Sequence, residues 1–98
     1  MPEFVLGSDR YAYALTLLEK KHPEAALAEM EKAIAKDRTI PNAQNQAGWL
    51  LLTELKHLPN ALPRAIAWFE AAHLAWPEEP APLVNWCNAL VRPGLSTV

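Results

Sequence analysis

The sequence predicts an all-α protein made of repeated helical hairpins, and three observations lead to this expectation. Its 98 residues include only three glycines and are rich in Ala, Leu and Glu, a composition that favours helix over strand. Segments with apolar residues at helical spacing are separated by breaks that contain proline. Residues 25–41 and 64–80, aligned 39 residues apart, carry matching alanines, a large apolar residue, a glutamate and a proline at the same positions. A self-match at a fixed period is typical of repeat proteins, whose units cover one another's apolar faces.

The matches between the two copies are not an effect of shared composition, because they preserve residue size at fixed positions. Small residues recur at i and i+7 with a large apolar residue at i+4, which gives one helical face a shallow groove with a knob in it. Another helix can pack closely on such a face. The aligned pairs are Ala26 and Ala65, Ala28 and Ala67, Met30 and Phe69, Glu31 and Glu70, Ala33 and Ala72, and Pro41 and Pro80.

The first hairpin is expected over residues 8–37. Residues 8–21 have apolar side chains at helical spacing after Ser8 or Asp9, either of which can cap a helix N-terminus. A second helix is expected from His22, with a proline at the position where its missing N–H costs least. The two helices are therefore predicted to be antiparallel and joined by a tight corner.

A second hairpin and a short last helix follow. Residues 42–57 are predicted to form the third helix and residues 61–76 the fourth, with Pro63 tolerated in the first turn of the latter. The segment "PEEP" is expected to interrupt the helical structure before a fifth helix over residues 81–91. The remaining residues are polar and are expected to form a tail.

These patterns resemble the tetratricopeptide repeat, a family of helix-turn-helix units, over roughly residues 8–91. The family's second helix carries Ala, a large aromatic residue, Ala and then Pro, which the second copy matches fully at Ala65, Phe69, Ala72 and Pro77. The first copy is a partial match at Ala26, Met30 and Ala33, because Arg38 stands where the proline is expected. The small residue of each first helix is assigned to Ala14, Gly48 and Cys87.

The resemblance implies a specific architecture. We expect one domain, residues 1–98, in which the hairpins stack as a short right-handed superhelix closed by a C-terminal capping helix. Repeat one spans about 8–41, repeat two about 42–80 and the capping helix about 81–91. About five residues are added between Gly48 and the next repeat position, so the third helix is predicted to be longer by about one turn.

Composition narrows the class of partner and the compartment. The formal net charge is −2, which is not the basic field that nucleic acid binding requires. No apolar stretch approaches the 18 residues of a membrane span, so no membrane partner is expected. A single cysteine gives no reason to expect an oxidising compartment. The cytoplasm is therefore the predicted location.

The sequence favours no catalytic motif. Two Glu-x-x-His sequences, Glu54 with His57 and Glu70 with His73, are of the kind that builds di-iron sites. Their different distances from the corner near Pro59 place the two imidazoles roughly 18 Å apart along the hairpin, so no metal ligand set is predicted. Cys87 is expected to pack as a small apolar residue. We predict no enzyme activity and no cofactor, with a metal-dependent helical enzyme as the least favoured alternative.

Two surfaces are candidates for binding. In tetratricopeptide proteins the first helices line a concave groove that takes peptides, so the resemblance implies a protein or peptide partner. The residues that it places in the groove are Tyr11, Asn45, Trp49, Asn85, Asn88 and Arg92. The alternative is that this concave face is solvated and binds nothing.

The second candidate surface is an aromatic stripe on the fourth helix. It consists of Trp68, Ala72 and Trp76, and the position of Trp68 corresponds to Glu29 in the first copy, which is expected to face water. The stripe can be covered by the third helix, by a partner or by a second copy of the chain. A self-associating unit, such as a homodimer, is therefore the first alternative function.

Overall fold

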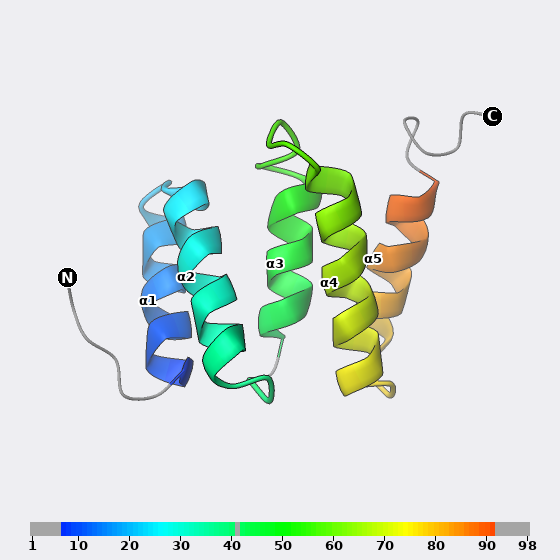
Figure 1. Ribbon diagram of the computed structural model, residues 1–98, viewed down its shortest axis with the longest axis horizontal. Helices are drawn as coiled ribbons and strands as arrows, with labels where there is room; N and C mark the ends of the chain where they lie inside the picture. Colours follow the sequence, from blue (N-terminus) through cyan, green and yellow to red (C-terminus); the bar gives the residue numbers. More distant parts are fainter. Residues whose placement is uncertain (1–6, 41, 92–98) are drawn as a thin grey trace.

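The computed structural model describes residues 7–40 and 42–91, and these residues form five helices and no strand. The helices are α1 (Gly7–Glu19), α2 (Pro23–Lys36), α3 (Ala43–Leu52), α4 (Ala61–Ala75) and α5 (Pro80–Leu90). Figure 1 shows each helix running antiparallel to the one before it. Each helix packs on the next, and α5 also contacts α3. The all-α prediction is confirmed for the described residues.

The corner between α1 and α2 is as tight as the sequence predicts. Lys21 has φ 65°, in the left-handed region, and ends α1. The backbone N–H groups of Lys21 and His22 donate to the carbonyls of Leu18 and Leu17, at 3.0 and 2.9 Å, the pairing that satisfies the last carbonyls of a helix. Pro23 then begins α2. Within the described residues no helix is long and apolar enough to cross a membrane.

Helix α3 is shorter than predicted. It ends at Leu52, and residues 53–60 form turns, so the expectation that the added residues lengthen this helix is wrong. The last carbonyls of α3 find other donors: the Thr53 hydroxyl donates to the Trp49 carbonyl at 2.7 Å, and the Leu55 N–H to the Leu50 carbonyl at 2.8 Å. Leu55 is fully buried. The chain therefore leaves the helical path and still places an apolar side chain in the core.

The groove and knob predicted from the repeat form the core of both hairpins. Met30 and Phe69, the aligned large residues, are completely buried, and the small residues four before and three after each of them, Ala26, Ala33, Ala65 and Ala72, are buried too, whereas Ala28 and Ala67 are exposed. A Cβ atom on Gly48 would lie 2.7 Å from Cε1 of the Phe69 ring and 3.1 Å from the Ala65 carbonyl oxygen. Only glycine therefore allows α3 and α4 to approach this closely.

Helix α5 buries one face and exposes the other. Pro82 and Ala89 are buried, and Trp86 packs partly buried against the core. Cys87 is exposed, so the expectation that it packs as a small apolar residue is wrong. The side chains that share its exposed face, together named the open face of α5, are Leu83, Val84, Leu90 and Val91, the last at the helix C-cap. No described helix lies on this face, which is why Cys87 stays exposed.

Candidate functional site

The residues predicted to line a groove lie on the odd-numbered helices. Tyr11 is on α1, Asn45 and Trp49 are on α3, and Asn85 and Asn88 are on α5. Arg92 lies outside the described residues. Tyr11 is half-buried and packs against the core, and this burial raises the pKa of its hydroxyl above the usual 10.0.

Asn45 links α3 to α5. Its Oδ1 accepts a hydrogen bond from Nδ2 of Asn85 at 3.0 Å, and its Nδ2 donates to Oδ1 of Asn42 at 3.2 Å. Asn45 is buried, so its amide holds two helices and the start of α3 in register. The sequence placed this amide against a peptide backbone, whereas the structure uses it within the chain.

Two of the predicted groove residues, Trp49 and Asn88, are exposed, and with Leu15, which was not predicted to line the groove, they form a row that we call the exposed row. Each follows directly after the small residue assigned to its helix, so the three occupy the same position on α1, α3 and α5. Trp49 is 43% exposed. An indole on the surface without cover is a feature of protein-binding sites, where Trp contributes a large apolar area.

The residues of the aromatic stripe of α4 differ in their exposure to solvent. Trp68 is half-buried, and its Nε1 donates to Oε2 of Glu31 on α2 at 3.1 Å, close to Arg64, whose Nη2 lies 3.3 Å from the same oxygen. Ala72 is buried, and Trp76 is exposed at the end of α4. The sequence left open cover by the third helix, by a partner or by a second copy, whereas the structure places α2, which was not among these, beside Trp68.

Glu29, the counterpart of Trp68, does not face water, and that expectation is wrong. It is 5% exposed. Its Oε2 lies 2.6 Å from Nη1 of Arg10 on α1, and its Oε1 lies 3.6 Å from Nζ of Lys32. A buried carboxylate requires such partners because an unpaired one is costly away from water. Arg10 comes from another helix, so the spacing on α2 alone did not reveal it.

The two Glu-x-x-His pairs lie in different surroundings. His57 is exposed, and its Nε2 lies 3.5 Å from Oε1 of Glu24 on α2. His73 is half-buried, its ring 6.2 Å from that of Trp86, and its Nδ1 has no hydrogen-bond partner. The described residues contain no group of three or more His, Cys, Asp or Glu that could hold a metal ion.

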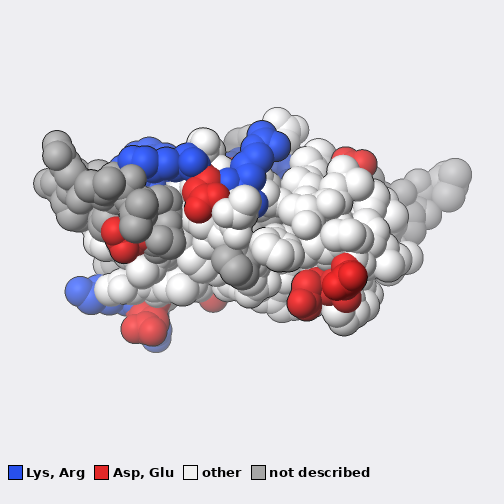
Figure 2. Space-filling view, turned by 90° about the horizontal axis from the view of Figure 1, so that it is seen from below, with Lys and Arg blue, Asp and Glu red and all other residues white. Residues whose placement is uncertain are grey.

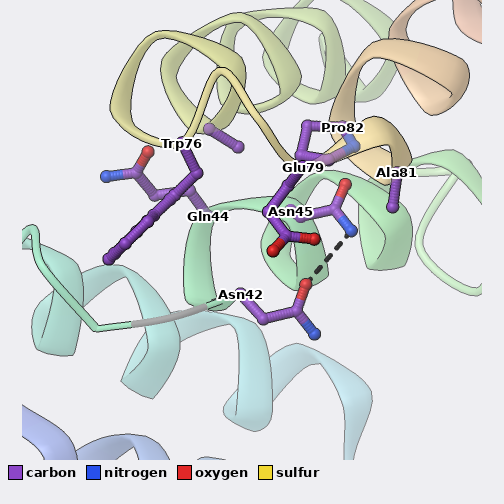
Figure 3. Close-up of a pocket in the computed structure, with 8 residues that line it drawn as sticks. Asn42, Gln44, Asn45, Trp76, Glu79, Ala81 and Pro82 are labelled. Carbon is purple, nitrogen blue, oxygen red and sulfur yellow. Dashed lines mark hydrogen bonds between the residues drawn. The ribbon is translucent and has the colours of Figure 1, made fainter.

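A pocket of about 280 Å³ lies where the start of α3, the end of α4 and the α4–α5 corner meet, and we call it the corner pocket. Figure 3 shows the Glu79 carboxylate directed from the α4–α5 corner toward Asn42 and Asn45 at the start of α3, and the Trp76 indole directed away from that carboxylate, on the side of the pocket where Gln44 lies. Gln44 is 5% exposed, and its Oε1 is buried with no hydrogen-bond partner. The lining residues are Asn42, Gln44, Asn45, Ala72, Trp76, Glu79, Ala81 and Pro82.

Sequence reasoning found only Asn45, Ala72 and Trp76 of this pocket, and assigned them to two different surfaces. The sequence feature that could have indicated the pocket is the pair of short polar segments "NAQN" and "PEEP". The first lies at the start of α3 and the second between α4 and α5. Because they are about 35 residues apart, only the antiparallel packing of α3 and α4 brings them together.

Charge is unevenly distributed over the molecule. Residues 65–91 contain three glutamates and neither lysine nor arginine. Figure 2 views the molecule from below, and its blue atoms lie toward the N-terminal half and the middle, whereas red atoms stand among white ones toward α4 and α5. No family model, no curated protein and no solved structure matches this chain significantly.

Proposed function

We propose that the chain is a tetratricopeptide-like, non-catalytic interaction module that binds a peptide across α1, α3 and α5. The observation that carries the proposal is the exposed row, because Leu15, Trp49 and Asn88 repeat one position on three helices. Two large apolar side chains followed by a carboxamide provide both contact area and hydrogen bonding for a peptide backbone.

Further support comes from the equivalence of α3 and α5. Ala43 and Leu50 on α3 are buried, and the residues 39 positions later, Pro82 and Ala89, are buried too. The two helices thus bury corresponding residues, as expected if α5 begins a third tetratricopeptide-like unit. The stacked, superhelical arrangement is part of this proposal.

The test is selection of binding peptides followed by substitution in the exposed row. A library of unstructured peptides displayed on phage is selected on the whole chain, and the affinities of the selected peptides are measured by calorimetry. Trp49→Ala is expected to weaken them by about 2 kcal/mol, roughly 30-fold, as for an aromatic hot spot. Leu74→Ala is the matched control, because Leu74 is an exposed apolar residue of α4 outside the row. Peptides that bind both variants equally would refute the groove.

The alternative function, self-association, is favoured by the open face of α5. Val84 and Leu90 are about half exposed there, and the face can pair with the same face of a second copy about a two-fold axis. Light scattering after size exclusion then gives a dimer that Leu90→Glu converts to a monomer, whereas Leu74→Glu does not. A monomer at every concentration of the unsubstituted chain rejects this alternative.

A further inference from the structure

The corner pocket contains a polar group with an unmet hydrogen bond. Oε1 of Gln44 is buried without a donor, and an unsatisfied buried acceptor costs about 1–3 kcal/mol. The last torsion of a Gln side chain has a broad, shallow energy profile. Rotation about this torsion therefore exchanges the positions of the amide oxygen and nitrogen of Gln44, which lines the pocket. A ligand with N–H groups would meet that need.

The charge of the corner pocket favours a cation. Glu79 is an acidic residue that forms no ion pair with any basic side chain of the described residues. The N-terminal ends of α3 and α5 adjoin the pocket with about +0.5 charge each, and the C-terminal end of α4 with about −0.5. The helix ends therefore offset only part of the carboxylate. No lysine or arginine between residues 65 and 91 supplies the rest.

The walls of the corner pocket favour a flat cation. Trp76 is 38% exposed, and a guanidinium group stacks on an aromatic face while its N–H groups stay free to donate. The volume of about 280 Å³ lies below the range of about 300–1,000 Å³ that is usual for drug-sized ligands. The space therefore suits a single side chain.

We propose that the corner pocket binds the arginine side chain of a partner peptide, with Glu79 and Gln44 accepting its N–H groups and Trp76 stacking on its plane. The inference rests on the proposed function only in naming a peptide as the source of the arginine. Asn45 forms part of the pocket wall and lies four residues before Trp49 on α3, so one peptide can reach both places. Arginine fits better than lysine because its planar fork presents five donors to acceptors on separate walls.

The first experiment uses the unsubstituted chain and a single-residue probe. N-acetyl-arginine methylamide is titrated while nitrogen–proton spectra report the side-chain amides of Asn42 and Gln44 and the indole N–H of Trp76. These signals are expected to shift with a dissociation constant of about 1–10 mM. The citrulline derivative has the same shape without the charge and should bind at least about tenfold more weakly. Equal binding of the two derivatives, tighter binding of the lysine derivative, or no shift at these groups would overturn the proposal.

The second experiment assigns the charge to one residue. Glu79→Gln is expected to weaken the arginine probe about tenfold, and Glu78→Gln, which removes the same charge next door and outside the pocket, to leave it within about twofold. Equal effects of the two variants would overturn the assignment. Trp49→Ala separates this inference from the proposed function, because it removes peptide binding to the exposed row and leaves the arginine probe unaffected. The circular dichroism of each variant checks that its helices are intact.

Discussion

Helices α3 and α5 occupy equivalent places in the chain, 39 residues apart, and they differ in what covers them. On α3 the face that includes Gly48 is buried against α4, whereas the corresponding face of α5 is exposed. The residue pairs, buried member first, are Gln44 and Leu83, Asn45 and Val84, Gly48 and Cys87, Leu51 and Leu90, and Leu52 and Val91. The exposed members are the more apolar at the first two positions.

The comparison shows that an apolar pattern on a helix does not by itself mean that the helix face is buried. Helix α5 carries an apolar face, and within the described residues no helix lies on it. Self-association would cover this face, and peptide binding at the exposed row would not. Substitutions at equivalent positions of the two helices therefore measure how much cover each helix has.

The largest difference is expected for equivalent leucines. Leu51→Ala removes a fully buried side chain and is expected to lower the free energy of unfolding by about 2–5 kcal/mol. Leu90→Ala removes a side chain that is 49% exposed and should cost less than about 1 kcal/mol. Urea unfolding followed by circular dichroism measures both. A loss at Leu90 as large as that at Leu51, and growing with protein concentration, would show that another molecule covers α5.

The small residues give the next largest contrast. Gly48→Ala places a Cβ atom against the Phe69 ring and should destabilise the chain by about 1–3 kcal/mol, although alanine favours helix by about 1 kcal/mol. Cys87→Ala on α5 should change stability by no more than about 0.5 kcal/mol. The control is Gly48→Ala combined with Phe69→Leu, since the smaller side chain should restore part of the loss. A neutral Gly48→Ala would contradict the close approach of α3 and α4.

Hydrogen exchange compares the helices without substitutions. The amides of α3 lie between packed neighbours and are expected to exchange only with global unfolding, so their protection should equal the free energy of unfolding. The amides of α5, covered on one face, should exchange through local opening at a lower free energy. Equal protection of the two helices would mean that α5 opens only together with the rest of the chain.

The smallest effect is expected at the corners that lead into the two helices. Before α3, Oδ1 of Asp37 accepts hydrogen bonds from the Thr39 hydroxyl at 2.5 Å and from its N–H at 2.9 Å, which hold the pKa of this carboxyl below its ordinary 3.8. Before α5 the Glu79 N–H donates to the Trp76 carbonyl at 3.0 Å. Because the folded pKa is lowered, the contribution of Asp37 is present above pH 3.8 and is lost as the pH falls through the folded value.

Asp37→Ala should therefore lower the melting temperature slightly at pH 6 and leave it unchanged at a pH below the folded pKa. Thermal unfolding of both proteins at the two pH values measures this difference. Arg38→Ala, a substitution of the exposed neighbour, is the control. A difference that is the same at both pH values would contradict the role of the ionised carboxylate.

The sequence was informative wherever structure depends on near neighbours. The start of α2 at Pro23 and the burial of Met30 and Phe69 follow from helical spacing and proline chemistry, and both are confirmed. The early end of α3 was missed because it depends on Leu55 reaching the core through a turn. The burial of Glu29 was missed because its partner Arg10 lies 19 residues away, on another helix.

The two parts of the candidate site also differ in how far the sequence indicates them. The sequence placed Trp49 and Asn88 at the same position of two helices, and both are exposed, on α3 and α5. Binding of a peptide to these residues stays a prediction. The corner pocket was not predicted, because its walls come from three helix ends that no local period relates.

By itself the sequence determined that this chain is helical and where each helix carries its small and large apolar residues, because hydrogen bonding and side-chain spacing within a helix are local. Only the tertiary structure decided which of those faces are covered, that an amide links α3 to α5, and that Gln44 and Glu79 share a pocket with Trp76. The physical reason is that burial and electrostatic environment depend on what packs against a residue, and those neighbours are distant in the chain.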